Sequence, residues 1–279
     1  MRQRMPSAIE TAAGIAAVVL VCSVFGMPGL FHAVRAEDAP GPASRPVVPR
    51  QGITFQSKAT QALQADDGAN PAMLWVEQGE KLWSVPMGAD AKSCAGCHGD
   101  ATVSMKGAVA RFPKVDPATG ALLNIEARIN KCRVEQQHAP PLAYESQDLL
   151  ALTAYLSVQS RGLPRDVHID GPAAAYFNSG RTFFTTRQGQ LNLSCAQCHD
   201  DSVGGKLRGD AISQGQTGGW PGYRLEWQTL GSLHRRLRAC SLGVRAEVLD
   251  FGSPDYVALE LYLAWRAKDL PLESPGVRR

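Results

Sequence analysis

Two short motifs constrain this chain more than any other feature. CAGCH spans residues 94–98 and CAQCH spans residues 195–199, so each places two cysteines and a histidine in a CxxCH pattern. In this pattern the two thiols form thioether bonds to haem vinyl groups, and the adjacent histidine binds the iron. The sequence therefore predicts two covalently attached haem c groups. The residues that would hold them are Cys94, Cys97, His98, Cys195, Cys198 and His199.

The N-terminal segment has the features of a secretory signal. Two arginines precede an apolar run over residues 12–31, and AVRA at residues 33–36 provides the small-x-small pattern of a cleavage site. We expect cleavage near Ala36 to remove residues 1–36 and to leave a periplasmic protein. A membrane anchor is the alternative, but Pro28 interrupts the apolar run and no stop-transfer flank follows it. The mature form is therefore expected to have no membrane anchor.

The charge of the chain excludes one class of partner. Its net charge is +3, and removing the signal leaves 26 basic and 25 acidic residues, or about +1. A charge this small gives no attraction of the whole molecule to nucleic acid or to anionic membranes. Any attraction for an anion must be local.

Six cysteines remain after the signal is removed, and they have two other interpretations. Three disulfides are the usual expectation for six cysteines in an exported protein. Zinc is the other ligand of CxxC pairs, but zinc patterns usually place the histidines farther from the cysteines. The CxxCH spacing favours haem over both.

The two halves of the chain resemble each other beyond the motifs. PAMLWVEQGEKLW at residues 71–83 aligns with PAAAYFNSGRTFF at residues 172–184, at the same offset of 101 residues that separates the motifs. SQDLLALTAYLSVQSRGLP at residues 146–164 aligns with SPDYVALELYLAWRAKDLP at residues 253–271. An internal duplication explains both alignments.

Both aligned segments of each half have helical periodicity, and Ser146 and Ser253 are suitable N-caps. The order helix, haem motif, loop, helix is similar to that of class I cytochrome c, whose first and last helices cross at a glycine and an aromatic residue. We expect an all-α fold of two tandem class I cytochrome c-like domains related by duplication. The expected crossings pair a glycine with a tyrosine, namely Gly79 with Tyr155 and Gly180 with Tyr262.

These features divide the chain into four parts. Residues 1–36 form the signal, and the proline-rich residues 37–70 form an N-terminal extension. Residues 71–165 form the first cytochrome c-like domain. Residues 166–279 form the second domain, which is expected to carry the active-site haem.

The sixth ligand of each haem is predicted to be a cysteine. Methionine is a usual ligand in electron carriers, but the three methionines left after signal removal all lie in the first half. Cys132 and Cys240 follow their motifs in matching contexts, RINKC and RLRAC. The alternatives are His138 for the first haem and His234 for the second, or a disulfide between the two cysteines.

A basic segment surrounds Cys240. HRRLRACSLGVRAE, residues 234–247, contains four arginines and one glutamate. Guanidinium groups would lower the pKa of a thiol and attract a small dianion. A basic helix face that docks an acidic protein is the alternative.

The two CxxCH motifs, the cysteine after each and the segment HRRLRACSLGVRAE together resemble the SoxA family, the dihaem subunits of the SoxAX cytochromes of bacterial sulfur oxidation. The likeness covers the chain from about residue 70. The resemblance implies a heterodimer with the monohaem cytochrome SoxX. It implies an L-cysteine S-thiosulfotransferase that joins thiosulfate to a cysteine of the carrier protein SoxYZ, with two electrons leaving through haem.

The resemblance also implies roles for single residues. The axial ligands would be His98 with Cys132, and His199 with Cys240. Cys240 matches the family's catalytic cysteine, which is found as a persulfide, and Arg236 matches its substrate-binding arginine. Two other functions are possible for such a chain: a dihaem thiosulfate dehydrogenase that releases tetrathionate, and a dihaem cytochrome that only carries electrons.

Overall fold

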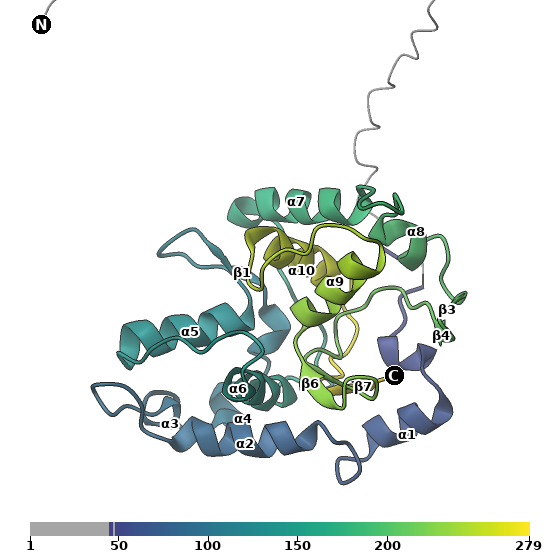
Figure 1. Ribbon diagram of the computed structural model, residues 1–279. Helices are drawn as coiled ribbons and strands as arrows, with labels where there is room; N and C mark the ends of the chain where they lie inside the picture. The colour runs from purple at the N-terminus through teal and green to yellow at the C-terminus, as the bar shows by residue number, and fades with distance from the viewer. Residues whose placement is uncertain (1–44, 47) are drawn as a thin grey trace, which may run out of the picture. The chain divides into compact units, whose positions relative to one another are not determined.

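The computed structural model of the chain describes residues 45, 46 and 48–279 (Figure 1). The expected signal, residues 1–36, and the first part of the extension lie outside these residues. The described residues all fall within one compact unit. Among them, no helix combines the length and the apolar character that crossing a membrane requires.

Helices account for most of the regular structure. In chain order they are η1 (Gly52–Phe55), α1 (Lys58–Ala65), α2 (Met73–Ser84), α3 (Cys94–His98), α4 (Ala101–Ser104), η2 (Val109–Arg111), α5 (Ile125–Gln136), α6 (Gln147–Val158), η3 (Gly171–Ala173), α7 (Ala174–Thr185), α8 (Cys195–His199), α9 (Leu233–Gly243) and α10 (Pro254–Arg266). The helices predicted over the aligned segments are confirmed as α2, α6, α7 and α10.

Two helix crossings organise the fold, one in each half (Figure 1). Helix α2 crosses α6 at Gly79, where an added Cβ would lie 2.1 Å from the carbonyl oxygen of Ala151 and 2.6 Å from Cβ of Tyr155. Helix α7 crosses α10 at Gly180, where an added Cβ would lie 2.1 Å from the carbonyl oxygen of Ala258. Only glycine permits backbones to approach this closely. The first crossing is the predicted one, whereas the atoms nearest to Gly180 belong to Ala258 and its neighbour rather than to Tyr262.

The two predicted N-caps differ. Ser146 Oγ accepts a hydrogen bond of 3.4 Å from the Leu149 N–H, as an N-cap should. Ser253 occupies the N-cap position of α10, but its hydroxyl makes no capping hydrogen bond. Pro254 follows it, and the fixed φ of proline is already suited to the first helical position.

The prediction of an all-α fold is not confirmed, because short strands accompany the helices. They are β1 (Lys114–Val115), β2 (Leu122–Leu123), β3 (Lys206–Leu207), β4 (Asp210–Ala211), β5 (Gly222–Arg224), β6 (Thr229–Gly231) and β7 (Gly276–Arg278). Strands β1 and β2 form one antiparallel hairpin, and β3 and β4 form another. In the three-stranded sheet, β5 lies between antiparallel β6 and parallel β7.

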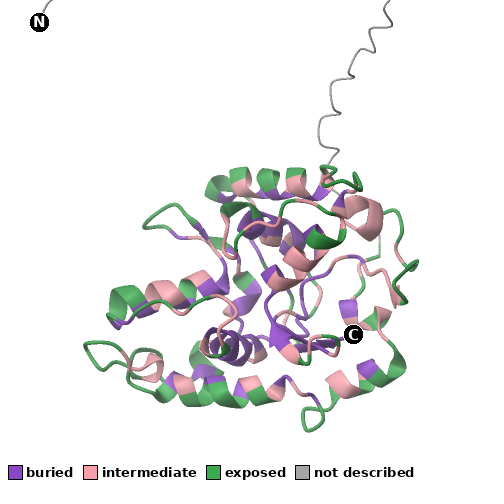
Figure 2. Cartoon of the chain, viewed as in Figure 1, coloured by how far each residue is buried: buried purple, intermediate pink, exposed green. Residues whose placement is uncertain are grey.

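The hydrophobic core has two parts, each built on one crossing, and each receives side chains from the other half. Tyr223 and Leu230, from the second half, pack in the core of α2 and α6. Leu122, from the first half, packs in the core of α7 and α10. Figure 2 shows the result, because α6 and α10 are buried whereas α2 and α7 keep exposed outer faces. This exchange binds the halves into one unit.

The described part of the N-terminal extension is tied to the C-terminus. Gln64 Oε1, on α1, accepts hydrogen bonds from the Val277 N–H at 2.9 Å and from the Arg278 guanidinium at 2.6 Å. Arg278 also pairs with Glu273 at 2.6 Å. The extension therefore covers the edge where β7 ends the chain.

Candidate active site

Each CxxCH motif forms one short helix whose start is capped by a serine. Ser93 Oγ accepts a hydrogen bond of 2.9 Å from the Gly96 N–H at the start of α3. At the start of α8, Ser194 Oγ accepts from the Gln197 N–H and the Gln197 side chain accepts from the Ser194 N–H, which is a capping box. A turn of helix puts residues i and i+3 on one face. Both cysteines of each motif therefore lie side by side, as attachment to one haem requires.

The loop before each motif packs against the chain just after the matching distal cysteine. An added Cβ on Gly88 would lie 1.9 Å from the carbonyl oxygen of Gln137, and one on Gly189 would lie 2.3 Å from that of Val244. Both glycines have positive φ. The two positions are 101 residues apart, the same offset as the motifs. The close approach is thus repeated in both halves.

Cys132 and Cys240 lie near their motifs. Burial, together with the charge of Cys240, raises the pKa of Cys195 to about 12. Burial likewise raises the pKa of Cys94, and the charge of Cys132 adds to that effect. The structure therefore brings the predicted distal cysteine of each half to the predicted attachment cysteines. All six described cysteines are free thiols, so the disulfide alternative does not form.

His199 is held as a metal-binding histidine should be. Its Nδ1 donates a hydrogen bond of 2.7 Å to the carbonyl oxygen of Ser213, which leaves the lone pair of Nε2 free for iron. An added Cβ on Gly215 would lie 3.2 Å from Cγ of the ring, so this glycine keeps space beside it. Burial lowers the pKa of His199, which favours the neutral ligand form. These residues fit a haem iron at this position.

His98 is in a different environment. It is exposed, and its ring centroid lies 5.8 Å from that of Trp83. Trp83 Nε1 donates a hydrogen bond of 2.9 Å to the carbonyl oxygen of Gly99. No hydrogen bond to the His98 ring is present in the part of the chain that the structure describes. The two histidines are thus held by different contacts.

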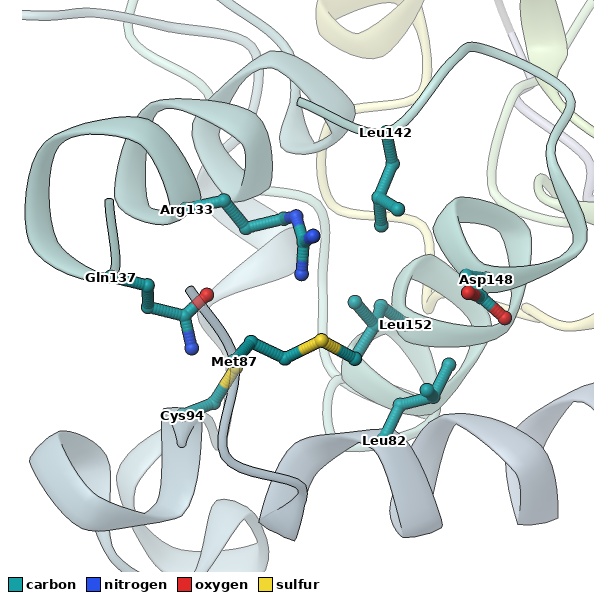
Figure 3. A pocket seen from close by; sticks show the side chains of 8 residues that line it. All are labelled: Leu82, Met87, Cys94, Arg133, Gln137, Leu142, Asp148 and Leu152. Carbon is teal, nitrogen blue, oxygen red and sulfur yellow. The ribbon is translucent and has the colours of Figure 1, made fainter. Parts of the chain in front are cut away.

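A cavity opens beside the first motif (Figure 3). Figure 3 shows the Met87 and Cys94 side chains in this space, with the Arg133 guanidinium reaching in from α5. Arg133 itself donates to the carbonyl oxygen of Pro140 at 3.2 and 3.3 Å. The residues that line the cavity are Leu82, Met87, Cys94, Arg133, Gln137, Leu142, Asp148 and Leu152. The Met87 thioether and the leucine side chains beside Cys94 suit the apolar edge of a haem, and Arg133, Gln137 and Asp148 add polar groups to the lining.

The arginines that precede Cys240 on α9 differ in their contacts. Arg235 pairs with Glu145 at 3.7 Å and stacks on Trp227. Arg238 donates to the carbonyl oxygen of Leu249 and stacks on a phenylalanine. The Arg236 guanidinium, half-buried on α9, has neither an ion pair nor a hydrogen bond with any residue in the described part of the chain.

Arg236 is also the arginine of α9 that faces the motif, because its charge lowers the pKa of His199 in addition to burial. Arg236 and Cys240 both lie within α9. Their spacing of four residues places them on one helix face, one turn apart. A cation without a partner among the described residues therefore lies close enough to a predicted haem ligand to affect its charge, and one helical turn from the predicted reactive sulfur.

The two alternative histidine ligands are engaged elsewhere. His138 is exposed and its Nδ1 lies 3.2 Å from Asp90 Oδ2. His234 is buried, its Nδ1 accepts a hydrogen bond from the Gly252 N–H, and its Nε2 lies 3.3 Å from Glu260 Oε2. Among residues 45, 46 and 48–279, no three His, Cys, Asp or Glu side chains are arranged to hold a metal ion, so the zinc interpretation lacks a ligand set there.

One buried arginine beside the second motif was not foreseen. Arg266, at the end of α10, donates to the Asp200 carboxylate and stacks on Phe184 at 4.5 Å. Its charge reaches both Cys195 and His199. Asp200 directly follows CAQCH, but nothing in the sequence indicates that an arginine 66 residues later would pair with it.

Known proteins resemble this chain over most of its length. L-cysteine S-thiosulfotransferase subunit SoxA of Pseudaminobacter salicylatoxidans is 42% identical over 229 residues, which cover 82% of this chain and 80% of that protein. The chain belongs to the SoxA family. SoxA of Rhodovulum sulfidophilum is also 42% identical with the same coverage, and a family model of the SoxA/TsdA cytochrome c domain matches residues 78–165.

A solved structure agrees with this SoxA-family assignment. The crystal structure of SoxXA from P. pantotrophus superposes with a TM-score of 0.80 and 39% identity, covering 83% of this chain and 87% of that one. The prediction of a cytochrome c fold is therefore confirmed. The prediction of an L-cysteine S-thiosulfotransferase subunit is confirmed by the names of the SoxA relatives.

Proposed function

We propose that this chain is the catalytic dihaem subunit that joins thiosulfate oxidatively to a cysteine of a carrier protein. The observation that carries this proposal is the unpaired guanidinium of Arg236, one helical turn before Cys240 and facing His199. A guanidinium binds sulfonate oxygens through paired hydrogen bonds and offsets their charge. Arg235 and Arg238 of α9 are already engaged with protein groups, so Arg236 is the arginine of this helix that remains available to substrate.

Two haem c groups would be held by the residues that the sequence predicts. The attachment cysteines are Cys94 and Cys97, and Cys195 and Cys198, and the axial ligands are His98 with Cys132 and His199 with Cys240. Bound haem supplies an iron that accepts electrons one at a time. Ser213 orients His199, and α9 presents the Cys240 sulfur and the Arg236 guanidinium to the same space.

The proposed reaction balances without a further reactant. One bond forms between the outer sulfur of thiosulfate and the cysteine sulfur of the carrier. The S–H bond of that cysteine breaks, its proton goes to solvent, and two electrons pass to haem acceptors. Arg236 holds the sulfonate end, so the outer sulfur points toward Cys240, which would take part as a persulfide.

The partners and location follow from the family. We propose a periplasmic heterodimer with SoxX, acting on SoxYZ, in a chain whose signal is cleaved near Ala36. The repeated helix crossings and the repeated glycine loops support two tandem cytochrome c-like domains, residues 71–165 and 166–279, that arose by duplication.

The test uses the purified complex with thiosulfate, a ferric acceptor and the carrier. We expect a carrier that gains the mass of a thiosulfonate group, two haems by intact mass, and no free tetrathionate. Free tetrathionate without the carrier would identify a thiosulfate dehydrogenase, and neither product would identify an electron carrier. If Cys240→Ala kept full carrier-dependent activity, the proposed role of that cysteine would be wrong.

A further inference from the structure

Four titratable side chains meet in the interior between the halves, outside both motifs. They come from four elements: Glu126 from α5, Glu145 from the turn before α6, His234 from α9 and Glu260 from α10. Glu126 and His234 are only 7% and 1% exposed. The mechanism proposed above uses none of them.

His234 and Glu260 form the centre of this cluster. His234 Nε2 lies 3.3 Å from Glu260 Oε2, and its Nδ1 accepts a hydrogen bond of 3.0 Å from the Gly252 N–H. While the ring is neutral, Nδ1 can accept this bond only with the ring proton on Nε2, which lies beside the carboxylate. Tyr144 stacks on the imidazole, and Asn124 Nδ2 donates a hydrogen bond of 3.3 Å to Glu260 Oε2. The ring is therefore held in one tautomer.

Glu126 is the member of the cluster that lacks compensation. Its Oε2 is buried and has no hydrogen-bond partner among the described residues. A buried carboxylate with an unpartnered oxygen is costly in its charged form, so it holds a proton more tightly. Burial raises the pKa of Glu126 to about 7, with the charge of Glu260 adding to the rise and that of His234 opposing it. Glu126 thus exchanges a proton near neutral pH.

Other charged groups around the cluster do not neutralise Glu126. Arg235 forms an ion pair with Glu145 at 3.7 Å, and the Ser232 N–H donates a hydrogen bond of 3.1 Å to the same carboxylate. Arg165 is buried and donates to the carbonyl oxygens of Val109 and Phe112, and only the charge of Glu260 reaches it. Arg235 and Arg165 are therefore bound to other groups, and neither forms an ion pair with Glu126.

Two members of the cluster lie on the helices that carry the distal cysteines. Glu126 precedes Cys132 by six residues on α5, and His234 precedes Cys240 by six residues on α9. Six residues of helix span about 9 Å. Within a protein interior, solvent screens only weakly the interaction of charges that lie within two turns of one helix. An electron that arrives at either iron would therefore raise the proton affinity of the cluster.

We propose that Glu126, Glu145, His234 and Glu260 form a buried proton-binding site that takes up a proton from solvent when an electron reaches a haem ligated by Cys132 or Cys240, and releases it when the electron leaves. This rests on the proposed haem ligation. Because linkage is reciprocal, protonation of the site must equally raise the reduction potential. Glu145, which is 17% exposed, gives the site its access to water.

The test measures haem reduction potentials of the complex against pH with a chemical titrant and no thiosulfate. In the wild type, at least one potential should fall as the pH rises through about 7, where Glu126 titrates. Glu126→Gln keeps the shape of the side chain but cannot titrate, so it should lose most of this slope. Glu135→Gln, an exposed change on the same helix, should keep it.

An infrared redox-difference spectrum gives a second readout. A band of a protonated carboxyl should appear on reduction of the wild type and be absent from Glu126→Gln. Equal slopes in the wild type and Glu126→Gln, or a flat wild type, would overturn the proposal. If Glu126→Gln fails to incorporate haem, Glu260→Gln removes a charge that raises the pKa of Glu126, so the pH-dependent fall in potential should move to lower pH, and an unmoved slope would overturn the proposal. Absence of haem from the wild type would instead contradict the proposed function, and failure to couple thiosulfate would leave the proton test intact.

Discussion

Arg236 is the residue at which charge and geometry can be separated. Arg236→Lys keeps the positive charge but loses the planar fork that binds two sulfonate oxygens. We expect kcat/KM for thiosulfate to fall roughly tenfold to a hundredfold, on the order of the one or two charge-assisted hydrogen bonds lost. Haem content should not change. Steady-state kinetics and the haem absorbance of the purified variant measure both.

Arg128 provides the matched control, because it precedes Cys132 by the same four residues on α5 but is exposed. Arg128→Lys should leave kcat/KM unchanged within experimental error. If Arg236→Lys also left kcat/KM unchanged, Arg236 would act through general charge rather than through contact with substrate.

Two sulfur atoms, those of Cys132 and Met87, are available near the first motif. Met87 lines the cavity beside Cys94, and the charge of Cys132 reaches the same cysteine. We expect thiolate ligation by Cys132, which stabilises ferric iron and lowers the potential. Cys132→Met should therefore change one set of electron paramagnetic resonance signals and raise one potential. Met87→Leu should change neither, and the reverse pattern would assign the ligand to Met87.

The predictability of the site depends on how local each signal is. The attachment residues stand out in the sequence because their spacing is short and chemically specific, and Cys240 stands out because its context matches that of Cys132. Ser213 and Gly215, which hold His199, lie in an irregular segment where no periodicity indicates which carbonyl or glycine will meet the ring. The pairing of Arg266 with Asp200 depends on tertiary structure alone. Arg236 could be identified as the unpaired arginine of α9 only from the contacts that Arg235 and Arg238 make in the structure.

At the scale of elements, the sequence predicts the four helices whose segments align between the halves and misses other helices and the strands. Helices α2, α6, α7 and α10 have clear apolar stripes and align between the halves. Helices α5 and α9 carry few apolar residues, so the segments that hold the distal cysteines were expected as loops. The strands are two or three residues long, which is too short for an alternating pattern to be visible.

The crossing of α7 and α10 depends on the absence of one methyl group. In Gly180→Ala the new Cβ would lie 2.1 Å from the carbonyl oxygen of Ala258, so the helices must separate. We expect the free energy of unfolding to fall by about 1–3 kcal/mol or more, as in other overpacked cores. Thermal unfolding followed by helical circular dichroism measures this loss.

A second helical glycine serves as the control. Gly243 ends α9, and an added Cβ there meets nothing within 4 Å. Gly243→Ala should leave the unfolding free energy unchanged or raise it by up to about 1 kcal/mol, because alanine favours helix. A similar loss in both variants would indicate that the close approach at Gly180 does not limit stability.

At the scale of the whole molecule, the two halves are similar in plan but do not stand apart. Tyr223 and Leu230 complete the first core, and Leu122 completes the second. The aligned segments reveal the repeated plan, because repeats of helix and motif are written in the sequence. The sequence does not reveal the exchange of core residues, because the pattern that predicts a buried leucine does not indicate which half it packs against. The interior between the halves also encloses Glu126.

The burial of Glu126 makes the stability of the whole molecule depend on pH. Its pKa rises from 4.5 to about 7 on folding, chiefly through burial. The folded state therefore binds a proton more tightly than the unfolded state, and this contribution is complete below about pH 4.5 and lost as the pH rises through about 7. Glu126→Gln mimics the protonated acid at every pH.

We therefore expect Glu126→Gln to match the wild type at about pH 4.5 and to be more stable at about pH 8, by on the order of 1–3 kcal/mol. Glu135→Gln, exposed on the same helix, should follow the wild-type curve throughout. Denaturant unfolding at a series of pH values measures all three proteins. A Glu126→Gln protein that lost stability at about pH 8 would show that the carboxylate is charged and paired in the folded state, contrary to the position of its unpartnered Oε2.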